Sequence, residues 1–406
     1  MNILVQKFGG TSLDTEENRR HAAWKVKEAV QNGYSVVVVV SAMGRGEGYP
    51  YSTDTLIGLM NEEIAGSMAE EMDLLLSCGE IISAVVFAGV LRGAGCESCA
   101  MSGRQAGIQT GGNFGEAHIR RVRPDRVLER LHLGQVVVVA GFQGVSDTGC
   151  VTTLGRGGSD ITAAALGCAL EAEKVEVFTD VDGIMTADPR VVSGATSVKR
   201  LTYREVCEMA HLGAKVIHPR AAEIATEGGV PLWIRNTFSQ DEGTLIADRL
   251  KLVEGIPIKG DTVVSGIAHI TSLAQVKVST GDVTAGKRLE VLKALAEAGI
   301  SLDLINVSPQ EMCFTIKEAK SECAKKLLES FALDVRIEKG FAKVSAVGAG
   351  MRGVPGVMAS IVESLTASGI EIHQSADSHT SISCLVRSED LCGAATALHN
   401  CFGLSE

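Results

Sequence analysis

The chain has 406 residues, of which 45% are hydrophobic, 21% are charged and 4% are aromatic, and its formal net charge is −11. This composition is ordinary for a globular protein with a large core, and the length favours two or three domains. The acidic balance argues against a nucleic-acid-binding protein, because the chain offers neither a basic stripe for phosphates nor many aromatic residues for base stacking.

Membrane insertion and secretion are also not expected. The longest apolar runs, at 36–40 and 136–140, are too short to cross a bilayer. The first strand-like stretch begins without a preceding signal peptide. We therefore expect a cytoplasmic protein that binds neither membranes nor nucleic acid.

The eleven cysteines are an odd number, and most of them lie in apolar or small-residue runs. This pattern predicts buried free thiols. Cys96 and Cys99 form a CxxC pair, but the sequence has no second pair or nearby histidine cluster to complete a zinc site. A metal or redox role for these thiols is therefore not predicted.

The first predicted strand, Ile3–Gln6, runs directly into a lysine and two glycines in the sequence KFGGTS at 7–12. A helix is expected over Asp14–Asn32, because apolar residues recur there at helical spacing and Gly33 stands where a C-cap glycine belongs. The phosphate-loop pattern GxxxxGK[ST] does not occur in the sequence. Free backbone N–H groups beside one lysine are nevertheless suited to a phosphate group.

From residue 35 to about residue 237, strand-like and helix-like runs alternate, which is the pattern of a parallel sheet covered by helices. The five valines Val36–Val40 predict a strand that is buried on both faces. A long apolar helix is expected over Ala69–Arg92, and it carries Glu80 in the sequence SCGE. Because an unpaired buried carboxylate is costly, Glu80 either points to solvent or meets a cationic group of a ligand.

A glycine-rich stretch, TTLGRGGSD at 152–160, lies between the apolar run Val136–Ala140 and a small-residue run, Ile161–Ala169, that predicts a helix. Such a strand, loop and helix connection favours an anion at the helix N-terminus. Arg156 adds a guanidinium suited to a carboxylate or a phosphate, and the glycines allow a ligand to approach the backbone. The alternative is a plain glycine-rich turn capped by Ser159.

The predicted strand Lys174–Phe178 ends in a polar loop, TDVDGIMTADPR at 179–190. Ligands of open α/β sheets bind beside the carboxyl ends of the strands, so this loop should converge with the two glycine-rich loops. A helix-like stretch, Tyr203–Leu212, then leads to His218 and Pro219. A histidine before a proline at a helix start favours a packing or turn role, although a catalytic role stays open.

The last third of the chain contains an internal repeat. Moving Leu295–Ile316 by seventy residues places it on Leu365–Val386, with glycines and aliphatic residues in register. Each copy reads as strand, helix, strand, strand, helix, and this order indicates a ferredoxin-like βαββαβ unit. The GxGxxG pattern at 348–353 follows a strand, but a repeat of this length is too short for a dinucleotide-binding domain.

Seven motifs in this order resemble those of aspartate kinases, which are members of the amino-acid kinase superfamily. They are KFGGTS at 7–12, VVVVVSAMG at 36–44, SCGE at 77–80, GFQG at 141–144, TTLGRGGSD at 152–160, FTDVDGIMTADPR at 178–190 and GAKVIHP at 213–219. The repeat is similar to the tandem ACT domains of this family. The length and the sequence SADSHTSIS are most similar to the diaminopimelate-sensitive type.

The fold implied by this resemblance is α/β. It consists of a three-layer amino-acid kinase domain with a mainly parallel sheet at 1–247, a linker at 248–262, and two ferredoxin-like βαββαβ ACT domains at 263–339 and 340–406. The implied reaction transfers the γ-phosphoryl group of ATP, with Mg²⁺, to the side-chain carboxylate of L-aspartate and gives 4-phospho-L-aspartate. This is the first step of lysine, diaminopimelate, threonine and methionine biosynthesis.

The resemblance also implies roles for individual residues. A carboxylate is already an adequate nucleophile, so such a site has to supply positioning and charge neutralisation rather than a general base. Catalytic roles fall on Lys7, Asp160 and Lys215. Substrate contacts fall on Thr53, Glu80, Arg156, Gly157, Gly158 and Ser159. Nucleotide contacts fall on Lys7, Phe8, Gly9, Gly10, Ser41, Thr179, Asp180, Met185, Asp188, Pro189 and Arg190. Met185 stands where many relatives carry a tyrosine, and its thioether can still cover a purine face.

Feedback regulation is implied by the ACT pair, which in this family binds an end-product amino acid: lysine, threonine or diaminopimelate. The family resemblance also implies a homodimer joined through its ACT domains. Two alternatives stay open: a kinase acting on glutamate or acetylglutamate, and a non-catalytic amino-acid sensor. The expected regulatory contacts are Ser279, Asp282, Asn306, Ser308, Met351, Val354 and Pro355.

Overall fold

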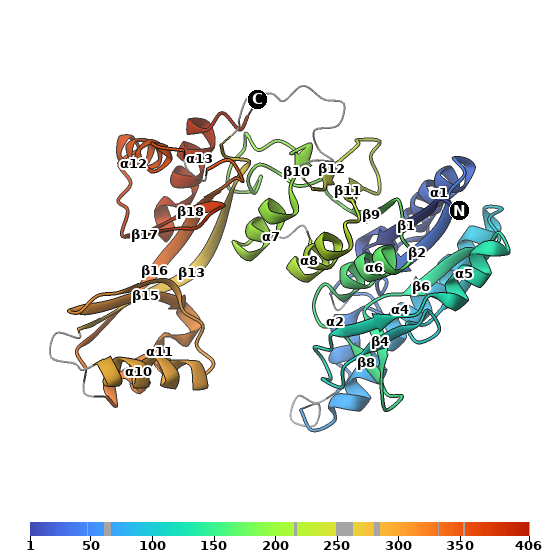
Figure 1. Ribbon diagram of the computed structural model, residues 1–406, viewed down its shortest axis with the longest axis horizontal. Helices are drawn as coiled ribbons and strands as arrows, with labels where there is room; N and C mark the ends of the chain where they lie inside the picture. Colours follow the sequence, from blue (N-terminus) through green and yellow to red (C-terminus); the bar gives the residue numbers. More distant parts are fainter. Residues whose placement is uncertain are drawn as a thin grey trace. The chain divides into compact units, whose positions relative to one another are not determined.

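The computed structural model describes residues 1–46, 48–60, 66–214, 217–248, 263–279, 285–331, 333–351 and 354–405. The chain forms two compact units, and many of their elements are labelled in Figure 1. Unit 1 contains Met1–Ile184, Ser197–Ala210 and Lys215–Pro257, and unit 2 contains Met185–Thr196, His211–Ala214 and Ile258–Glu406. Two short segments that precede residue 215 are therefore part of unit 2, although the sequence places them between elements of unit 1.

Unit 1 is built on an eight-stranded sheet with the order β10-β12-β11-β9-β1-β2-β6-β3. All neighbouring pairs in this order are parallel except β11 and β12. The valine-rich strands β2 and β6 are buried along nearly their whole length, as their continuous apolar runs predict. The strands are β1 (Ile3–Phe8), β2 (Ser35–Val40), β3 (Ser98–Met101), β6 (Val136–Ala140), β9 (Lys174–Thr179), β10 (Arg200–Leu201), β11 (Leu232–Asn236) and β12 (Thr244–Ile246).

Helices cover both faces of this sheet, which confirms the three-layer α/β fold. On one face, α1 (Glu16–Gln31) and α4 (Ala69–Gly93) bury Val26 and Phe87 in a cluster with Val36 and Val38 of β2. The alternate residues of β2 point to the other face. There α6 (Gly158–Ala169) lies against β1, β2 and β9 and packs on α8 (Pro219–Gly228). Unit 1 also contains α2 (Thr53–Ile57), α5 (Asp125–His132) and most of α7 (Tyr203–His211).

A second sheet in unit 1 has four strands in the order β5-β4-β7-β8. These strands are β4 (Ile108–Thr110), β5 (Ile119–Val122), β7 (Gln143–Ser146) and β8 (Val151–Thr153). The antiparallel pair of β7 and β8 delivers the chain into the glycine-rich stretch that precedes α6. The small sheet therefore fixes the start of that loop.

Helix α4 is 25 residues long and, by length and composition alone, apolar enough to cross a membrane. However, 50% of its apolar window is buried inside the protein. The helix contacts α1, β3, β6 and β8, and its buried residues include Asp73, Ser77 and Glu80. It is packed as a core helix of unit 1.

Unit 2 contains a six-stranded antiparallel sheet with the order β14-β15-β13-β16-β18-β17. Four helices pack with it in two hydrophobic clusters, one for each copy of the sequence repeat. The strands are β13 (Gly266–Ser279), β14 (Asp303–Val307), β15 (Glu311–Lys317), β16 (Val335–Val347), β17 (Gln374–Asp377) and β18 (Ser381–Arg387). The helices are α10 (Ala285–Glu297), α11 (Ser321–Glu329), α12 (Val357–Ala367) and α13 (Leu391–Cys401).

The two copies of the repeat share their longest strands. Residues 266–270 of β13 pair with 343–347 of β16, whereas residues 275–278 of β13 pair with 335–338 of β16. The first half of β13 therefore completes the sheet of the second copy. The expectation that each copy supplies its own consecutive βαββαβ order is wrong for that strand, and the expected division between 339 and 340 falls inside the continuous strand β16.

The segment Met185–Thr196 is tied into the second copy of the repeat. Ala187 and Val192 belong to the same hydrophobic cluster as the buried residues of α12 and α13. The Thr186 hydroxyl lies 2.8 Å from Nε2 of the fully buried His399, and the Thr186 carbonyl accepts the Ile267 N–H at 2.7 Å. Burial lowers the pKa of His399 below its usual value. Part of the polar loop that follows β9 is thus held by unit 2.

The eleven cysteines are free thiols. Only Cys96 and Cys384 are buried, so the prediction of buried thiols is wrong for most of them. Burial raises the pKa of Cys384 to about 11. That thiol is therefore neutral in the core of unit 2.

Candidate active site

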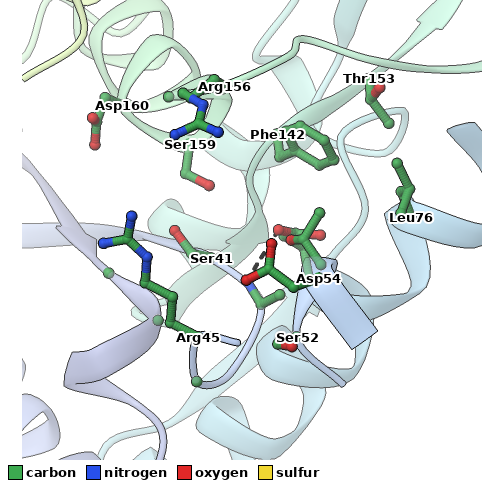
Figure 2. Close-up of a pocket in the computed structure, with 18 of the residues that line it drawn as sticks. Ser41, Arg45, Ser52, Asp54, Leu76, Phe142, Thr153, Arg156, Ser159 and Asp160 are labelled. Carbon is green, nitrogen blue, oxygen red and sulfur yellow. Dashed lines mark hydrogen bonds between the residues drawn. The ribbon is translucent and has the colours of Figure 1, made fainter. Parts of the chain in front are cut away.

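A cavity of about 600 Å³ opens in unit 1 beside the carboxyl ends of β1, β2 and β9. Figure 2 shows side chains from several loops around it, including Ser41, Arg156, Ser159 and Asp160. The two glycine-rich loops converge here as predicted, whereas of the polar loop 179–190 only Thr179 and Asp180 line the cavity. The sequence-predicted residues that line the cavity are Lys7, Gly9, Gly10, Ser41, Thr53, Glu80, Arg156, Gly157, Gly158, Ser159, Asp160, Thr179 and Asp180.

The glycine loop after β1 packs closely on the loop after β2. The Gly10 carbonyl accepts the Gly44 N–H at 3.0 Å, and a Cβ at Gly10 would lie 2.5 Å from the Gly44 carbonyl oxygen. Any side chain at residue 10 would therefore displace backbone. This close approach leaves the loop as a glycine-lined wall of the cavity, where a ligand can reach the main chain.

Lys7, the last but one residue of β1, forms an ion pair across the cavity with Asp160 in the first turn of α6. The distance from Nζ to Oδ1 is 2.7 Å, and the two side chains are 12% and 13% exposed. Asp160 therefore holds the ammonium group in place beside the two glycine-rich loops. This arrangement presents a positioned cation to a ligand.

The glycine-rich loop 155–158 turns through left-handed backbone before α6. Gly157, the N-cap of α6, has φ +72°, and a Cβ there would lie 2.5 Å from Cβ of His218. His218 is itself the N-cap of α8, where Nδ1 accepts the Arg220 N–H at 3.3 Å. The predicted turn and packing role of His218 is confirmed.

Two arginines line the cavity from different loops. Arg156 precedes α6, and Arg45 follows β2, and both are exposed (Figure 2). Within the described part of the chain, neither guanidinium has a hydrogen-bond or ion-pair partner. Together with the N-terminus of α6, these groups make the cavity attractive to anions.

Glu80 lies on the buried side of α4, with only 3% of its surface exposed. The alternative in which it points to solvent is therefore wrong. Its Oε1 accepts the Ala42 N–H at 3.0 Å, whereas Oε2 has no partner among the described residues. Burial raises the pKa of this carboxyl group to about 8. Glu80 thus presents, at the cavity wall, an oxygen with no partner among the described residues, and a cationic ligand group there would favour the ionised carboxylate.

Some predicted nucleotide contacts are not among the residues that line this cavity. The Phe8 side chain is fully buried and stacks on Phe178, with ring centroids 4.8 Å apart, so only its backbone is available at the loop. Asp188 and Arg190 form an ion pair of 2.7 Å with each other, and the hydrogen bond from Arg190 lowers the pKa of Asp188 to about 2. Met185, Asp188, Pro189 and Arg190 belong to unit 2 and are not among the residues that line this cavity. Lys215 lies outside the described residues.

Sequence reasoning missed several lining residues. Arg45 had a usable signal, because it directly follows the loop after a buried strand. Phe142 and Thr153 lie inside the motifs GFQG and TTLGRGGSD, but neither they nor Leu76 stand out as lining residues, since apolar and hydroxyl side chains at such positions are equally common in cores. Gly155 is one of the glycines predicted to let a ligand approach. The missed lining residues are Thr11, Ala42, Gly44, Arg45, Ser52, Asp54, Ile57, Leu76, Gly115, Phe142 and Thr153.

The residues predicted to contact a regulator lie at different depths in unit 2. The exposed ones are Ser279 at the end of β13, Asn306 in the edge strand β14, and Val354 and Pro355 before α12. Ser308 closes the turn between β14 and β15, where its hydroxyl donates to the Glu311 carbonyl and accepts the Glu311 N–H. Met351 is only 7% exposed and is packed in the hydrophobic cluster of the second copy. Asp282 lies outside the described residues.

Comparison with protein-family models matches residues 2–236 to the amino acid kinase family and residues 336–400 to an ACT domain. The first match runs along the sequence from β1 to the end of β11. The second covers most of the second copy of the repeat, beginning inside β16.

Curated relatives match the chain over its whole length. Aspartokinase 1 of Bacillus subtilis is 47% identical over 406 residues, with 100% of each chain covered. The aspartokinase of Geobacillus stearothermophilus is 40% identical, with 100% of this chain and 98% of the relative covered. Among solved structures, Escherichia coli aspartokinase III in complex with aspartate and ADP is 26% identical, with a TM-score of 0.76 and 98% and 99% of the two chains covered.

The extent of these matches, with the cavity at the expected sheet edge, defines the class of this protein as an amino acid kinase with a regulatory unit. The chain belongs to the aspartokinase family.

Proposed function

We propose that this protein transfers the γ-phosphoryl group of ATP to the side-chain carboxylate of L-aspartate and produces 4-phospho-L-aspartate. The observation that carries this proposal is the cavity itself. It combines the Lys7–Asp160 ion pair, the unpaired guanidinium of Arg156 and the free oxygen of Glu80 within one space of about 600 Å³. The cavity can therefore bind two anionic groups and one ammonium group at the same time.

The amino-acid substrate is assigned to the side of the cavity formed by α4 and the loop 155–159. Glu80 binds the α-ammonium group through Oε2, because that oxygen is buried and has no partner among the residues that the structure describes. Arg156 binds a carboxylate of aspartate, and Ser159 and Thr53 add hydroxyl contacts. Gly157 and Gly158 give the substrate access to backbone N–H groups at the start of α6.

The nucleotide is assigned to the side formed by the loops after β1 and β9. Gly9 and Gly10 offer backbone N–H groups to the phosphates, and Lys7 neutralises charge on the transferring group. Thr179 and Asp180 line the same cavity. The aspartokinase III relative was solved with aspartate and ADP, which supports binding of both an amino acid and a nucleotide.

Mg²⁺ is expected to accompany ATP. The carboxylates of Asp160 and Asp180 line the cavity, and one or two carboxylates together with phosphate oxygens are the usual ligands of this ion. The ion would neutralise phosphate charge. Lys215, which lies outside the described residues, and the segment 185–190 stay in the proposal as nucleotide-side contacts on the strength of the family motifs.

The reaction requires little covalent chemistry from the protein. The nucleophile is an ionised carboxylate, so no side chain has to remove a proton. The work of the site is to hold two anions in line and to offset their repulsion. Lys7, Arg156, Arg45 and the N-terminus of α6 are the groups available for this purpose in the described residues.

The test is ADP release measured with L-aspartate and, in parallel, with L-glutamate and N-acetylglutamate. We expect release with L-aspartate at a kcat/KM at least about a hundredfold above that with L-glutamate, because one extra methylene misplaces the reacting carboxylate. Preference for glutamate or acetylglutamate would move the protein to another branch of the amino acid kinases. Binding of an amino acid without ADP release would favour the sensor alternative.

We further propose that unit 2 binds an end-product amino acid and inhibits the kinase. The ferredoxin-like modules support this proposal, and a relative, aspartokinase III, was also solved with lysine and aspartate in a T-state. Lysine, threonine and diaminopimelate are the candidates, and the ligand that raises the melting temperature in a thermal-shift panel identifies the effector. We also propose a homodimer and a biosynthetic role in the cytoplasm. The strands β14 and β17 stand at the two ends of the strand order and are the candidates for pairing between protomers, although Gln374 of β17 already donates to the Leu304 carbonyl of β14.

A further inference from the structure

Asp73 is a second buried carboxylate on α4, and the reaction as described above does not use it. It lies two helical turns before Glu80 and has only 1% of its surface exposed. Its two oxygens accept four hydrogen bonds from two residues. Gly115 donates its N–H to both oxygens at 3.0 Å, and Thr153 donates its N–H and its hydroxyl at 2.7 Å each.

All of these donors belong to the wall of the cavity. Gly115 and Thr153 line it, and so does Leu76, one turn after Asp73 on α4. Figure 2 shows Thr153 and Leu76 on the same side of the cavity, away from Asp160. Asp73 therefore joins three parts of the chain that are distant in sequence: α4, β8 and the loop between β4 and β5.

The joined wall also supports the loop that carries Arg156. Thr153 is the last residue of β8, three residues before Arg156. The Thr153 carbonyl accepts the Ala117 N–H at 2.9 Å, and a Cβ at Gly155 would lie 3.2 Å from the Gly115 carbonyl oxygen. A change in how Asp73 holds Gly115 and Thr153 is thus passed directly to the base of the 155–158 loop.

We infer that Asp73 is a positioning residue for the amino-acid substrate, acting through Thr153 and Gly115 on the placement of Arg156. This inference rests on the proposed function. A buried carboxylate is costly unless its oxygens are satisfied, and the four hydrogen bonds to Asp73 described above all come from residues that line the cavity. Three donor groups that converge from two backbone segments require an acceptor with two oxygens. Asp73 supplies that acceptor at the point where the substrate wall is assembled.

The primary experiment is Asp73→Asn, measured in the full-length protein with L-aspartate and ATP varied separately. The amide keeps the shape but turns one acceptor into a donor that faces Gly115 N–H or Thr153. We expect the KM for L-aspartate to rise at least about tenfold, while kcat and the KM for ATP stay within about threefold of the wild-type values. Equal changes in both KM values, or a loss of kcat alone, would overturn the inference.

A matched control is provided by Glu205→Gln in α7. Glu205 is 7% exposed, and its Oε2 accepts the N–H of Thr202 at 2.8 Å and the hydroxyl of Thr202 at 2.7 Å. Like Asp73, it is a buried carboxylate that accepts a backbone N–H and a threonine hydroxyl, but these bonds are local and Thr202, unlike Thr153, does not line the cavity. We expect this variant to lower the melting temperature without changing either KM. A similar rise in the KM for aspartate would show that destabilisation alone explains the effect of Asp73→Asn.

Thr153→Val completes the design, because it removes only the hydroxyl bond to Asp73 Oδ1. We expect a smaller rise in the KM for aspartate, near-normal values for Thr153→Ser, and less than additive effects when Thr153→Val is combined with Asp73→Asn. If Asp73→Asn does not fold, a normal KM for L-aspartate in Thr153→Val overturns the inference.

The failure of this inference can be told apart from the failure of the proposed function. A wild-type protein that is inactive with L-aspartate overturns both. An active wild-type protein with a normal Asp73→Asn variant overturns only the inference.

Discussion

The two units of this protein differ in where they leave polar groups without partners. In unit 1, parallel strands end at one edge, and the described residues there include a buried carboxylate oxygen on Glu80 and the unpaired guanidinium groups of Arg45 and Arg156. In unit 2, antiparallel strands run through both copies of the repeat, so that β13 and β16 each serve two modules. Unit 1 thus leaves bonding groups open at its sheet edge, whereas the two modules of unit 2 are joined by shared strands.

The chain connects these two behaviours through the segment Met185–Thr196. It continues directly from the loop after β9, whose Thr179 and Asp180 line the cavity, yet its Ala187 and Thr186 are held in the core of unit 2. A change in the packing of that core has a covalent route of a few residues to the nucleotide side of the cavity. This would give the proposed feedback a physical basis, since a bound effector shifts activity only through differential affinity for two states.

The role of unit 1 as the ligand-binding unit is tested most strongly by removing a charge from its cavity. Lys7→Met keeps the length of the side chain but removes the cation held by Asp160 at 2.7 Å. We expect kcat to fall at least about a hundredfold, which is the scale of losing one well-placed electrostatic contact to a developing charge. Steady-state ADP release measures the effect. The control is Lys199→Met, which removes an exposed ion pair of 2.9 Å with Asp241 and should leave kcat near the wild-type value. A folded Lys7→Met variant with normal turnover would refute the phosphate role of Lys7.

The next largest effect is expected at the amino-acid side of the same cavity. Glu80→Gln preserves the bond from Ala42 N–H but cannot become anionic at Oε2. A hydrogen bond to a charged group contributes about 1.5–3 kcal/mol, so the KM for L-aspartate should rise by roughly 10- to 100-fold. The KM for ATP should change much less, because ATP carries no ammonium group. Equal rises in both constants would place Glu80 in the fold rather than in the site.

The raised pKa of Glu80 predicts a pH dependence for substrate binding. Burial raises that pKa from 4.5 to about 8 in the ligand-free protein, so below pH 8 most molecules carry a neutral carboxyl group. Only the ionised form pairs with an ammonium group. The KM for L-aspartate should therefore fall as the pH rises toward 8, by at most about tenfold per pH unit, and level off above it. In Glu80→Gln this dependence should disappear, and a wild-type KM that is flat between pH 6 and 8 would contradict the assignment.

Much of unit 1 could be predicted from the sequence because its signals are local. Val36–Val40 and Val136–Ala140 are continuous apolar runs, and such runs identify buried parallel strands. The glycines at 9–10 and 155–158 mark the loops that meet at the cavity. The carboxyl ends of parallel strands lie along one edge, so the convergence of these loops followed from topology.

What could not be predicted depends on contacts between distant residues. Asp73 looks like any acid in the first turns of a helix, and its partners are 42 and 80 residues further along the chain. The assignment of 266–270 to the second copy depends on pairing with 343–347, which no periodicity reveals. The same holds for Met185–Thr196, whose motif indicates the nucleotide side but whose apolar residues pack in unit 2.

The smallest effect on turnover is expected in unit 2, where inhibition should be separable from catalysis. Asn306 lies on the edge strand β14, is exposed, and pairs with Cys313 of β15. The repeat aligns it with Ala376, which pairs with Ser383 in the same register, so alanine is already compatible with this backbone. Asn306→Ala is therefore a cleaner variant than Met351→Ala, which would open a cavity in a packed core.

Asn306→Ala should shift inhibition to at least about fivefold higher effector concentration, which is within the coupling of about 1–3 kcal/mol expected between two sites. Turnover without effector should stay within a few-fold of wild type, because no residue assigned to the chemistry lies in β14. The measurement is a set of inhibition curves with lysine, threonine and diaminopimelate, and Gln310→Ala, an exposed amide in the adjoining turn, serves as the matched control. If Asn306→Ala loses activity outright while what remains keeps full sensitivity, this edge of unit 2 supports the fold, and the effector has to be sought in another part of the molecule.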